Sequence, residues 1–296
     1  MEARVSFSTL YGTGKFGLSF ELFPPKSAES EVAMWQTVED LMAFSPSLVT
    51  CTYGAGGSTR GKTLDIVEGV HRKYGLPVAS HLTCVGSSVD ELREYLAEAL
   101  DRGVSGIVAL RGDPPKGETE FRPVVGGLSY ASELVQLIHT ECPSLDIAVA
   151  GYPETHQEAM SEEMDLENLK RKCDAGGQAV ITQLFYENSD LFRFRDRCES
   201  LGIHTPIVPG VMPVVNFSQV RRIAKLCKAK LPAEFINAME KAGESESAQF
   251  EAGVQFATQQ VHELVRAGVP GLHFYVLNRS PATAQVLQQV GISGKN

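Results

Sequence analysis

The stretch from Val78 to Leu110, VASHLTCVGSSVDELREYLAEALDRGVSGIVAL, contains the unit from which the fold is built. It begins with a short apolar run at Val78–Leu82 and ends with another at Gly106–Leu110, which is typical of strands buried on both faces of a parallel sheet. Between these runs, Val89–Arg102 carries apolar residues at helical spacing, and Ser88 can cap its first turn. The stretch therefore predicts a strand–helix–strand unit.

The same alternation continues along the chain. Short apolar or β-branched runs predict eight strands, at Leu18–Phe23, Leu48–Tyr53, Val78–Leu82, Gly106–Leu110, Ile147–Tyr152, Ala179–Phe185, Pro206–Val211 and Leu272–Leu277. Apolar residues at helical spacing predict helices in the gaps, at Glu31–Phe44, Gly61–Tyr74, Val89–Arg102, Tyr130–Thr140, Glu162–Ala175, Ser189–Leu201, Phe217–Lys228 and Ala248–Ala267. Eight units of about 37 residues favour an α/β fold with a (β/α)8 TIM barrel of eight parallel strands over a doubly wound open sheet.

No break in this pattern divides the chain, so we expect a single domain over residues 1–296. The most linker-like stretch is Ala229–Ser247, which contains Pro232 and a polar run. We expect an insertion there, between the seventh and eighth strands, with a short helix at Ala233–Lys241. The segment Pro114–Ser129 is a second long loop, and long loops in compact domains are often functional.

The composition excludes several classes of protein. Hydrophobic residues make up 43% of the chain and charged residues 21%, which excludes wholesale disorder. The formal net charge of −9 argues against a general binder of nucleic acid or of an anionic membrane, but it allows a local basic pocket. We see no signal peptide and no apolar stretch long enough for a membrane span. The six cysteines are scattered without a CxxC pair, which indicates reduced thiols and a cytoplasmic protein.

Polar, ionisable or glycine-rich residues follow most of the predicted strands. In a (β/α)8 barrel, the loops after the carboxyl ends of the strands carry the active site. Examples are the segments His81–Cys84, Arg111–Pro115 and Tyr152–His156. This concentration of functional residue types at one end of the barrel indicates an enzyme.

Glu21 interrupts an otherwise apolar strand, in the sequence Phe20-Glu21-Leu22-Phe23. A carboxylate among aromatic residues is costly unless it is paired or functional. Two interpretations are open: a general acid, or a buried glutamate paired with a lysine or arginine.

Two further motifs imitate known sites. Gly56–Thr63 satisfies the phosphate-loop pattern G-x-x-x-x-G-K-[ST], which makes a P-loop-like nucleotide hydrolase the alternative function. No later strand ends in the metal-binding aspartate that such hydrolases use, so we favour an ordinary glycine-rich loop. His81 and Cys84 form an H-x-x-C pair with no second pair, and we predict no metal site.

Two groups of charged residues have both a structural and a functional interpretation. Arg111 and Asp113, at the end of a strand, form either a structural ion pair or a clamp for a ligand. Asp165, Asn168 and Lys172 lie on one helical face and make a polar cluster with Arg171. That cluster is either a solvated helix face or part of a binding site.

Taken together, the strand-end segments resemble methylenetetrahydrofolate reductase. The resemblance runs from Leu18 to Arg279 and is carried by seven segments in order: Phe20–Lys26, Thr52–Arg60, His81–Cys84, Ala109–Pro115, Gly151–His156, Asn168–Gly176 and His273–Arg279. The family's catalytic unit is a (β/α)8 barrel that binds FAD, and the chain resembles its short bacterial form, without the regulatory domain of eukaryotic members.

This resemblance implies a flavoprotein oxidoreductase of one-carbon metabolism, in the branch that serves methionine biosynthesis. NADH or NADPH would reduce the flavin, and reduced flavin would convert 5,10-methylenetetrahydrofolate to 5-methyltetrahydrofolate in a ping-pong reaction. Glu21 would protonate N10 of the folate, and Asp113 would lie beside flavin and pterin. The resemblance to bacterial members favours NADH. We also expect a homo-oligomer that binds neither nucleic acid nor membranes.

The same resemblance assigns individual residues. The implied FAD contacts are Thr52, Tyr53, Ala55, His81, Arg111, Gly112, Asp113, Ala131, Tyr152, His156, Asp165, Asn168, Arg171 and Lys172. The implied substrate contacts are Glu21, Asp113, Gln183, Gln219 and Arg279, with Glu21 and Asp113 as the catalytic pair. Arg171 and Lys172 suit the pyrophosphate of FAD. Lys26 and Ile223 lie where family members vary, and we assign them no role.

Overall fold

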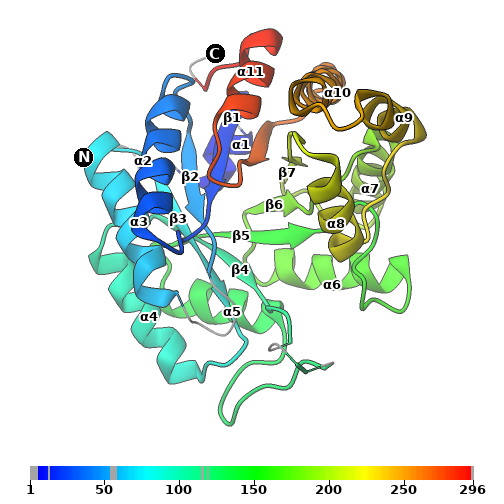
Figure 1. The fold of residues 1–296 in the computed structure, drawn as a ribbon. Helices are drawn as coiled ribbons and strands as arrows, with labels where there is room; N and C mark the ends of the chain where they lie inside the picture. Colours follow the sequence, from blue (N-terminus) through cyan, green and yellow to red (C-terminus); the bar gives the residue numbers. More distant parts are fainter. Residues whose placement is uncertain (1–5, 13, 54–58, 115–116, 119, 295–296) are drawn as a thin grey trace.

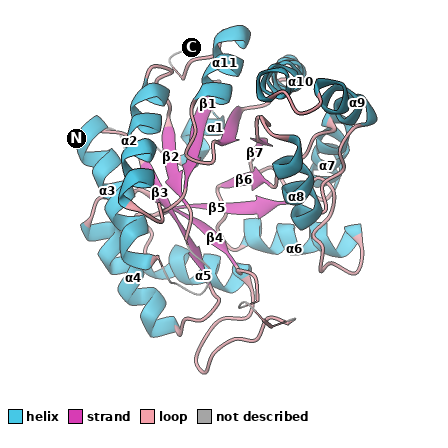
Figure 2. Ribbon diagram, in the orientation of Figure 1, coloured by secondary structure: helices cyan, strands magenta, loops and turns pink. Residues whose placement is uncertain are grey.

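Strands and helices alternate along the chain in the computed structural model, which describes residues 6–12, 14–53, 59–114, 117–118 and 120–294. The described strands are β1 (Gly17–Leu22), β2 (Leu48–Cys51), β3 (Val78–Thr83), β4 (Gly106–Leu110), β5 (Asp146–Gly151), β6 (Ala179–Thr182), β7 (Ile207–Val208), β8 (Gly210–Val211) and β9 (Gly271–Tyr275). The described helices are α1 (Phe7–Gly12), α2 (Ala28–Met42), α3 (Arg60–Tyr74), α4 (Val89–Asp101), α5 (Ala131–Glu141), α6 (Glu162–Asp174), α7 (Asn188–Ser200), α8 (Phe217–Cys227), α9 (Ala233–Ala242), α10 (Glu246–Arg266) and α11 (Pro281–Val290). Figures 1 and 2 show the strands at the centre with helices around them.

The strands form one parallel sheet that curls into a nearly closed barrel, as predicted. Its order is β7-β6-β5-β4-β3-β2-β1-β9-β8, and every pairing between these strands is parallel. The predicted count of eight strands is wrong, because the segment Pro206–Val211 forms two short strands that meet at Pro209. Proline has no N–H for a ladder hydrogen bond, so a continuous strand is interrupted there. β7 pairs with β6, and β8 pairs with β9, so the divided strand occupies the seam of the barrel.

The unit that opened the sequence analysis forms as predicted, with β3 and β4 adjacent and α4 between them in sequence. Ser88 caps α4: its hydroxyl accepts a hydrogen bond from the backbone of Glu91, whose carboxylate accepts one from the backbone of Ser88 at 2.8 Å. The short helix predicted at Ala233–Lys241 is confirmed as α9. The other predicted helices are present, with ends displaced by a few residues.

Two helices were not predicted, and α1 has a structural role inside the barrel. Its side chains Phe7 and Tyr11 are each 1% exposed and pack against inward-facing barrel residues such as Ala79 and Ala148. The backbone N–H of Phe7 donates to the carboxylate of Asp146, at the start of β5, over 2.9 Å. The short helix therefore closes the barrel at the amino ends of the strands, opposite the end that carries the predicted site. The second unpredicted helix, α11, packs against α10.

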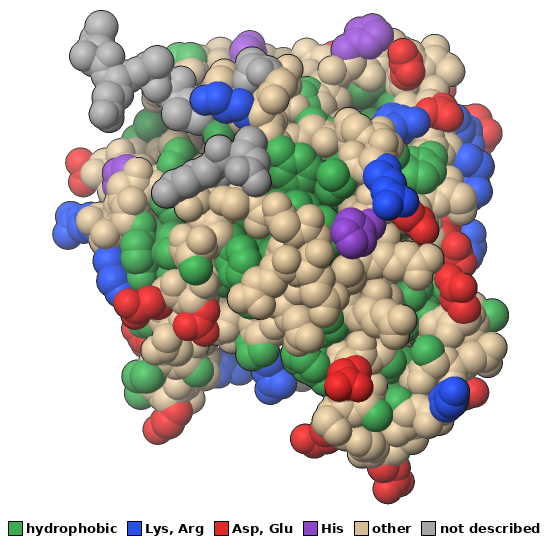
Figure 3. All heavy atoms as spheres, turned by 90° about the horizontal axis from the view of Figure 1, so that it is seen from above, with side chains coloured by type: hydrophobic (Ala, Val, Ile, Leu, Met, Phe, Trp, Pro, Cys, Tyr) green, Lys and Arg blue, Asp and Glu red, His purple; other side chains and the backbone are tan. Residues whose placement is uncertain are grey.

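One face of the molecule carries charged side chains of both signs. On the face that Figure 3 shows, acidic and basic side chains of the described residues are intermixed and lie mostly toward the edges. Within the described part of the chain, no helix is both long and apolar enough to cross a membrane. The six cysteines are free.

Candidate active site

A cavity of about 570 Å³ opens at the carboxyl ends of the strands. Ten of the residues predicted from the sequence line it: Glu21, Thr52, Tyr53, His81, Arg111, Gly112, Asp113, Tyr152, His156 and Gln183. These residues come from strands or strand-end loops all around the barrel, and the parallel arrangement brings them to one end. The structure thus places most of the predicted site in one cavity.

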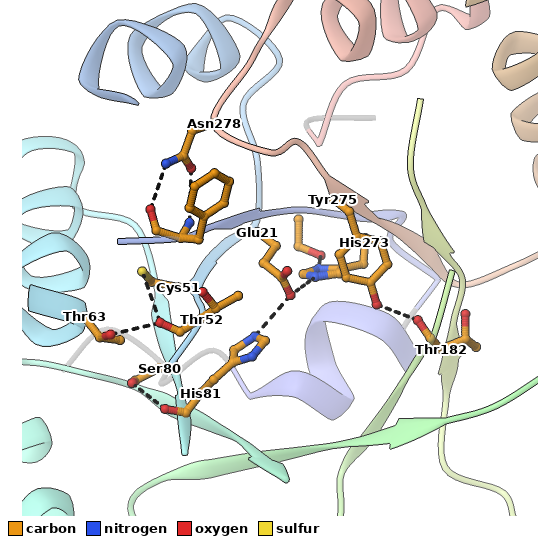
Figure 4. Close-up of polar contacts among 12 residues, drawn as sticks. Glu21, Cys51, Thr52, Thr63, Ser80, His81, Thr182, His273, Tyr275 and Asn278 are labelled. Carbon is orange, nitrogen blue, oxygen red and sulfur yellow. Dashed lines mark hydrogen bonds and ion pairs between the residues drawn. The ribbon is translucent and has the colours of Figure 1, made fainter. Parts of the chain in front are cut away.

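Glu21 lies between two histidines in the wall of this cavity (Figure 4). Its Oε2 atom is 3.3 Å from Nε2 of His81 and 3.5 Å from Nε2 of His273. The Glu21 side chain is 17% exposed, and the structure records no lysine or arginine partner for it among the described residues. The alternative of a glutamate paired with lysine or arginine is therefore wrong, and Glu21 remains accessible from the cavity.

Among the described residues that line this cavity, two have a buried side-chain atom without a hydrogen-bond partner. These atoms are Nε2 of His81, which faces Glu21 without hydrogen-bond alignment, and Oγ1 of Thr83. Both residues line the cavity. Because buried polar groups are nearly always satisfied, the two atoms are candidates for contact with a bound molecule.

Burial lowers the pKa of His81, with a smaller opposing effect from the Glu21 carboxylate and a further lowering by His273. The folded protein therefore binds this proton less tightly than the unfolded chain, in which the pKa is about 6.5. We expect the free energy of unfolding to fall as the pH is lowered through about 6.5, because the unfolded chain then binds more protons.

Replacing His81 with Asn should flatten this pH dependence, as measured by urea unfolding of the protein without ligands between about pH 5 and 8. The values at pH 8, where the imidazole is neutral in both states, provide the reference for effects of the substitution other than titration. Equal pH slopes in the two proteins would contradict the expectation.

Arg111 is paired, but its partner lies outside the Arg111-Gly112-Asp113 segment. Its guanidinium contacts the carboxylate of Glu158 at 2.8 Å and lies 5.1 Å from the ring centroid of Phe121, in the long loop after β4. The interpretation of Arg111 and Asp113 as a structural ion pair is therefore not supported. Asp113 is exposed at the cavity rim, where its carboxylate can meet a ligand.

Residues of α6 extend the site beyond the cavity lining. The Lys172 ammonium donates to the carbonyl of Ala150 over 2.6 Å, and burial lowers its pKa. The Asp165 carboxylate accepts from the backbone N–H of His156 over 2.8 Å, which fixes the loop after β5. Arg171, by contrast, is exposed and contacts Asn168 at 3.1 Å. The four residues thus do not form one cluster: two face the barrel and two face solvent.

A second cavity of about 710 Å³ adjoins the first and shares with it Met212, Ile223, Tyr275 and Leu277. It is lined by Gln219 and Arg279, the two predicted substrate contacts that the first cavity lacks. Among the described residues that line this second cavity, Lys26 and Arg279 are the only charged ones. A local cationic region of this kind, in a chain of net charge −9, suits an anionic ligand.

The Asn278 side chain holds the loops around this second cavity together. Its amide accepts from the backbone N–H of Phe23 at 3.1 Å and donates to the carbonyl of Phe23 at 2.7 Å. Leu277 and Asn278 both have left-handed backbone conformations, with φ of 50° and 52°. Such conformations are uncommon outside glycine and persist when the surroundings require them. Arg279 follows directly, is exposed and lines the same cavity.

Some predicted residues lie elsewhere or outside the described part of the chain. Ala131 begins α5 and does not line either cavity. Ala55 and the first residues of the Gly56–Thr63 motif lie outside the described residues. At the end of that motif, the Thr63 hydroxyl is buried and donates to the carbonyl of Thr52 over 2.9 Å (Figure 4). Because the Thr63 hydroxyl already makes this hydrogen bond with the backbone, the structure argues against a role for it in binding a metal ion.

The H-x-x-C pair does not form half of a metal site. His81 faces Glu21, whereas the Cys84 thiol contacts the carbonyls of Leu110 and Tyr130 at 3.5 and 3.6 Å. In the described ranges there is no group of three or more histidine, cysteine or acidic residues that could hold a metal ion.

Sequence reasoning did not assign a role to His273 or Tyr275, although both line the first cavity. His273 contacts Glu21, and the Tyr275 hydroxyl donates to the carbonyl of Thr182 at 2.7 Å, across to β6. The spacing of the two residues in the sequence could have indicated their position, because residues two apart on a strand share a face. His273 and Tyr275 are such a pair, and they pair in register with Ser19 and Glu21 of β1.

Comparisons with known proteins place the chain among proteins of one family. A family model described as methylenetetrahydrofolate reductase matches residues 6–291. The 5,10-methylenetetrahydrofolate reductase of Escherichia coli (strain K12) is 39% identical over 279 residues, which cover 94% of this chain and 92% of that protein. The Zea mays protein named methylenetetrahydrofolate reductase (NADH) 1 is 35% identical, and the match covers 95% of this chain and 49% of that protein.

A solved structure shares the fold at low sequence identity. It is an uncharacterized protein from Clostridium thermocellum, described as binding two copies of 5-methyl-5,6,7,8-tetrahydrofolic acid. Its TM-score is 0.63 with 14% identity, and the match covers 94% of this chain and 95% of that chain.

Proposed function

Because the chain belongs to the methylenetetrahydrofolate reductase family, we propose that it reduces 5,10-methylenetetrahydrofolate to 5-methyltetrahydrofolate. We further propose FAD as its cofactor and NADH as the reductant, with nicotinamide and folate bound in turn at one site. The observation that carries the proposal is the cavity at the carboxyl ends of the strands, in which Glu21 is exposed between two histidines.

The residues around the first cavity fit FAD. Nε2 of His81 and Oγ1 of Thr83 are buried without partners, as expected of groups that bind a polar ring system. Gly112, in the cavity wall, has φ of 88°, and a Cβ atom there would lie 2.7 Å from Cγ1 of Val85, so the shape of the wall at this point requires glycine. Of the two predicted pyrophosphate contacts on α6, Lys172 faces the barrel and can supply positive charge there, whereas Arg171 faces solvent. The chemistry that FAD supplies when bound is hydride transfer, from the nicotinamide to flavin and from flavin to the methylene carbon.

Glu21 has the geometry of a general acid for the folate. Opening the five-membered ring of 5,10-methylenetetrahydrofolate requires a proton on N10, which makes that nitrogen a leaving group and yields an iminium carbon that accepts a hydride. The Glu21 carboxyl reaches into the cavity, while His81 and His273 flank the carboxylate that remains after proton transfer. A positioned acid of this kind contributes a factor of about 10² to 10⁴ in rate.

Other cavity residues hold the substrate. Asp113, at the rim, can accept hydrogen bonds from the pterin, and Gln183 lines the same cavity. In the adjoining cavity, Gln219 and Arg279 lie where the remainder of the folate would extend, and Arg279 can pair with a carboxylate. The two cavities share four lining residues and therefore adjoin, and we propose that one folate molecule extends from the first into the second.

The test is anaerobic stopped-flow spectroscopy of the purified protein. We expect a yellow protein whose flavin absorption near 450 nm (approximate, a property of the cofactor) is bleached by NADH faster than by NADPH and restored by 5,10-methylenetetrahydrofolate. A colourless protein that hydrolyses ATP with Mg²⁺ would overturn the proposal in favour of the phosphate-loop alternative. Bleaching without recovery on addition of folate would reduce the proposal to a flavin-binding barrel of another activity.

A further inference from the structure

A chain of polar side chains runs through the barrel from the active-site cavity toward α1. Nε2 of His273 lies 3.5 Å from Oε2 of Glu21, and Nδ1 of the same ring lies 2.9 Å from Oγ of Ser19. The Tyr11 hydroxyl donates to Oγ of Ser19 over 2.8 Å. Ser19 and His273 are fully buried and Tyr11 is 1% exposed, so these contacts lie inside the protein. Figure 4 shows the Glu21–His273 end of the chain.

We propose that Tyr11 is a positioning residue that sets the tautomer of His273, so that the ring presents Nε2–H to Glu21. The proposal rests on the proposed role of Glu21 as the general acid. It assigns to α1, a helix at the opposite end of the barrel, an influence on the reacting proton.

The direction of each hydrogen bond carries the argument. Burial raises the pKa of Tyr11 to about 12, so its hydroxyl keeps its proton and donates to Ser19. A serine hydroxyl has one proton to donate, and Ser19 has two acceptors within reach: Nδ1 of His273 at 2.9 Å and the carbonyl of Leu272 at 3.3 Å. Donation to Nδ1 uses the shorter contact, and it places the ring proton on Nε2.

The groups that face Glu21 favour the same tautomer. Its neighbours are His81 on β3, His273 and Tyr275 on β9, and Cys51 on β2. Burial keeps the protons on Tyr275 and Cys51, since it raises the pKa of both. A carboxylate at Glu21 repels an imidazole lone pair and attracts an N–H, so Nε2–H of His273 stabilises the anion that remains when the acid has given up its proton.

The Tyr11→Phe substitution removes one oxygen and keeps the ring that packs inside the barrel. Without the Tyr11 donor, the Ser19 hydroxyl is less polarised, so its hydrogen bond to Nδ1 of His273 weakens and acceptance from Nδ1–H competes better. The ring is then expected to populate both tautomers. The Glu21 carboxylate then loses part of the hydrogen bond from Nε2–H that stabilises it. The rate of folate reduction is expected to fall at high pH, where the acid is deprotonated. We expect this high-pH limb of the rate profile to lie about half to one pH unit higher in the variant, the effect of one hydrogen bond of ordinary strength.

The primary test is ¹⁵N NMR of the histidine rings in the protein without cofactor, with His273 assigned through His273→Gln. The expected result is a protonated Nε2 in the wild-type protein and averaged ring resonances in Tyr11→Phe. Ser19→Ala should give the same change and provides a second variant should Tyr11→Phe fold poorly. Tyr95→Phe is the matched control, since it removes another buried tyrosine–serine contact, to Ser80, outside this chain of residues.

The outcomes separate this proposal from the proposed function. Protonated Nδ1 in the wild-type protein, or unchanged ring resonances in both Tyr11→Phe and Ser19→Ala, would overturn the tautomer assignment while leaving the reductase proposal intact. Folate reduction that survives in Glu21→Gln would instead refute the acid role, whatever the tautomer of His273. The tautomer assignment and the acid role are both supported if the high-pH limb of folate reduction shifts upward in Tyr11→Phe but not in Tyr95→Phe, while flavin reduction by NADH is unchanged.

Discussion

Replacing Glu21 with Gln should reduce the folate half-reaction by a factor of about 10² to 10⁴, while NADH still reduces the flavin at a nearly normal rate. Glutamine has the size of glutamate but no acidic proton, so N10 of the folate would remain a poor leaving group. Hydride transfer from NADH to flavin needs no proton from this position. Stopped-flow measurement of the two half-reactions separates these effects, because each has its own change in flavin absorption.

Glu39→Gln is the control for this substitution. Glu39 is an exposed carboxylate on α2, the helix that follows β1, and its pairing with Lys73 at 3.8 Å is a surface contact. Both half-reactions should be unchanged in this variant. Loss of both half-reactions in Glu21→Gln would show that the residue maintains the cavity or the cofactor, and would contradict its role as an acid.

The largest expected loss of stability comes from Phe7→Ala. The Phe7 ring is 1% exposed and lies in the cluster inside the barrel, where the strands provide aliphatic residues that include Ala79, Ala148 and Ala179. Removing the ring leaves a cavity that rigid strands cannot fill, and such substitutions cost about 3 to 5 kcal/mol. Urea unfolding at equilibrium should show this loss of free energy, whereas Val125→Ala, at a side chain that is 99% exposed, should change it by less than about 0.5 kcal/mol.

A double-mutant cycle with Gly106 tests the packing directly. A Cβ atom added at Gly106, at the start of β4, would collide with the Phe7 ring. Gly106→Ala should therefore destabilise the wild-type protein and cost much less in the Phe7→Ala background. Additive effects would indicate that the ring does not lie against this glycine.

Several features could be predicted from local sequence because they depend on residues near one another in the chain. The alternation of strands and helices follows from apolar spacing, and the cap of α4 follows from Ser88 and Glu91 three residues apart. The clustering of His81, Arg111 and Tyr152 follows from parallel topology alone, since residues at the carboxyl ends of parallel strands must meet. The end of the barrel that holds the site was therefore predictable before any contact was known.

Partners from distant segments were not predictable in the same way. Arg111 and Asp113 are two residues apart in sequence, yet Arg111 pairs with Glu158, which lies on the loop after the next strand. Asp165 and Arg171 belong to one helix, yet Asp165 faces the loop of His156 and Arg171 faces solvent. These outcomes depend on how each loop folds back over the barrel.

The sequence by itself determined the α/β alternation, the barrel class and the residues gathered at its functional end, because periodicity and strand polarity are local properties. Only the tertiary structure decided how the barrel closes, where Pro209 divides one strand so that its halves pair with opposite neighbours. It also decided that Phe7 and Tyr11 fill the interior, and that Glu21 lies between His81 and His273 rather than beside a lysine or arginine. The physical reason is that strand register and closure bring together residues up to about 250 positions apart, and no local pattern encodes those distances.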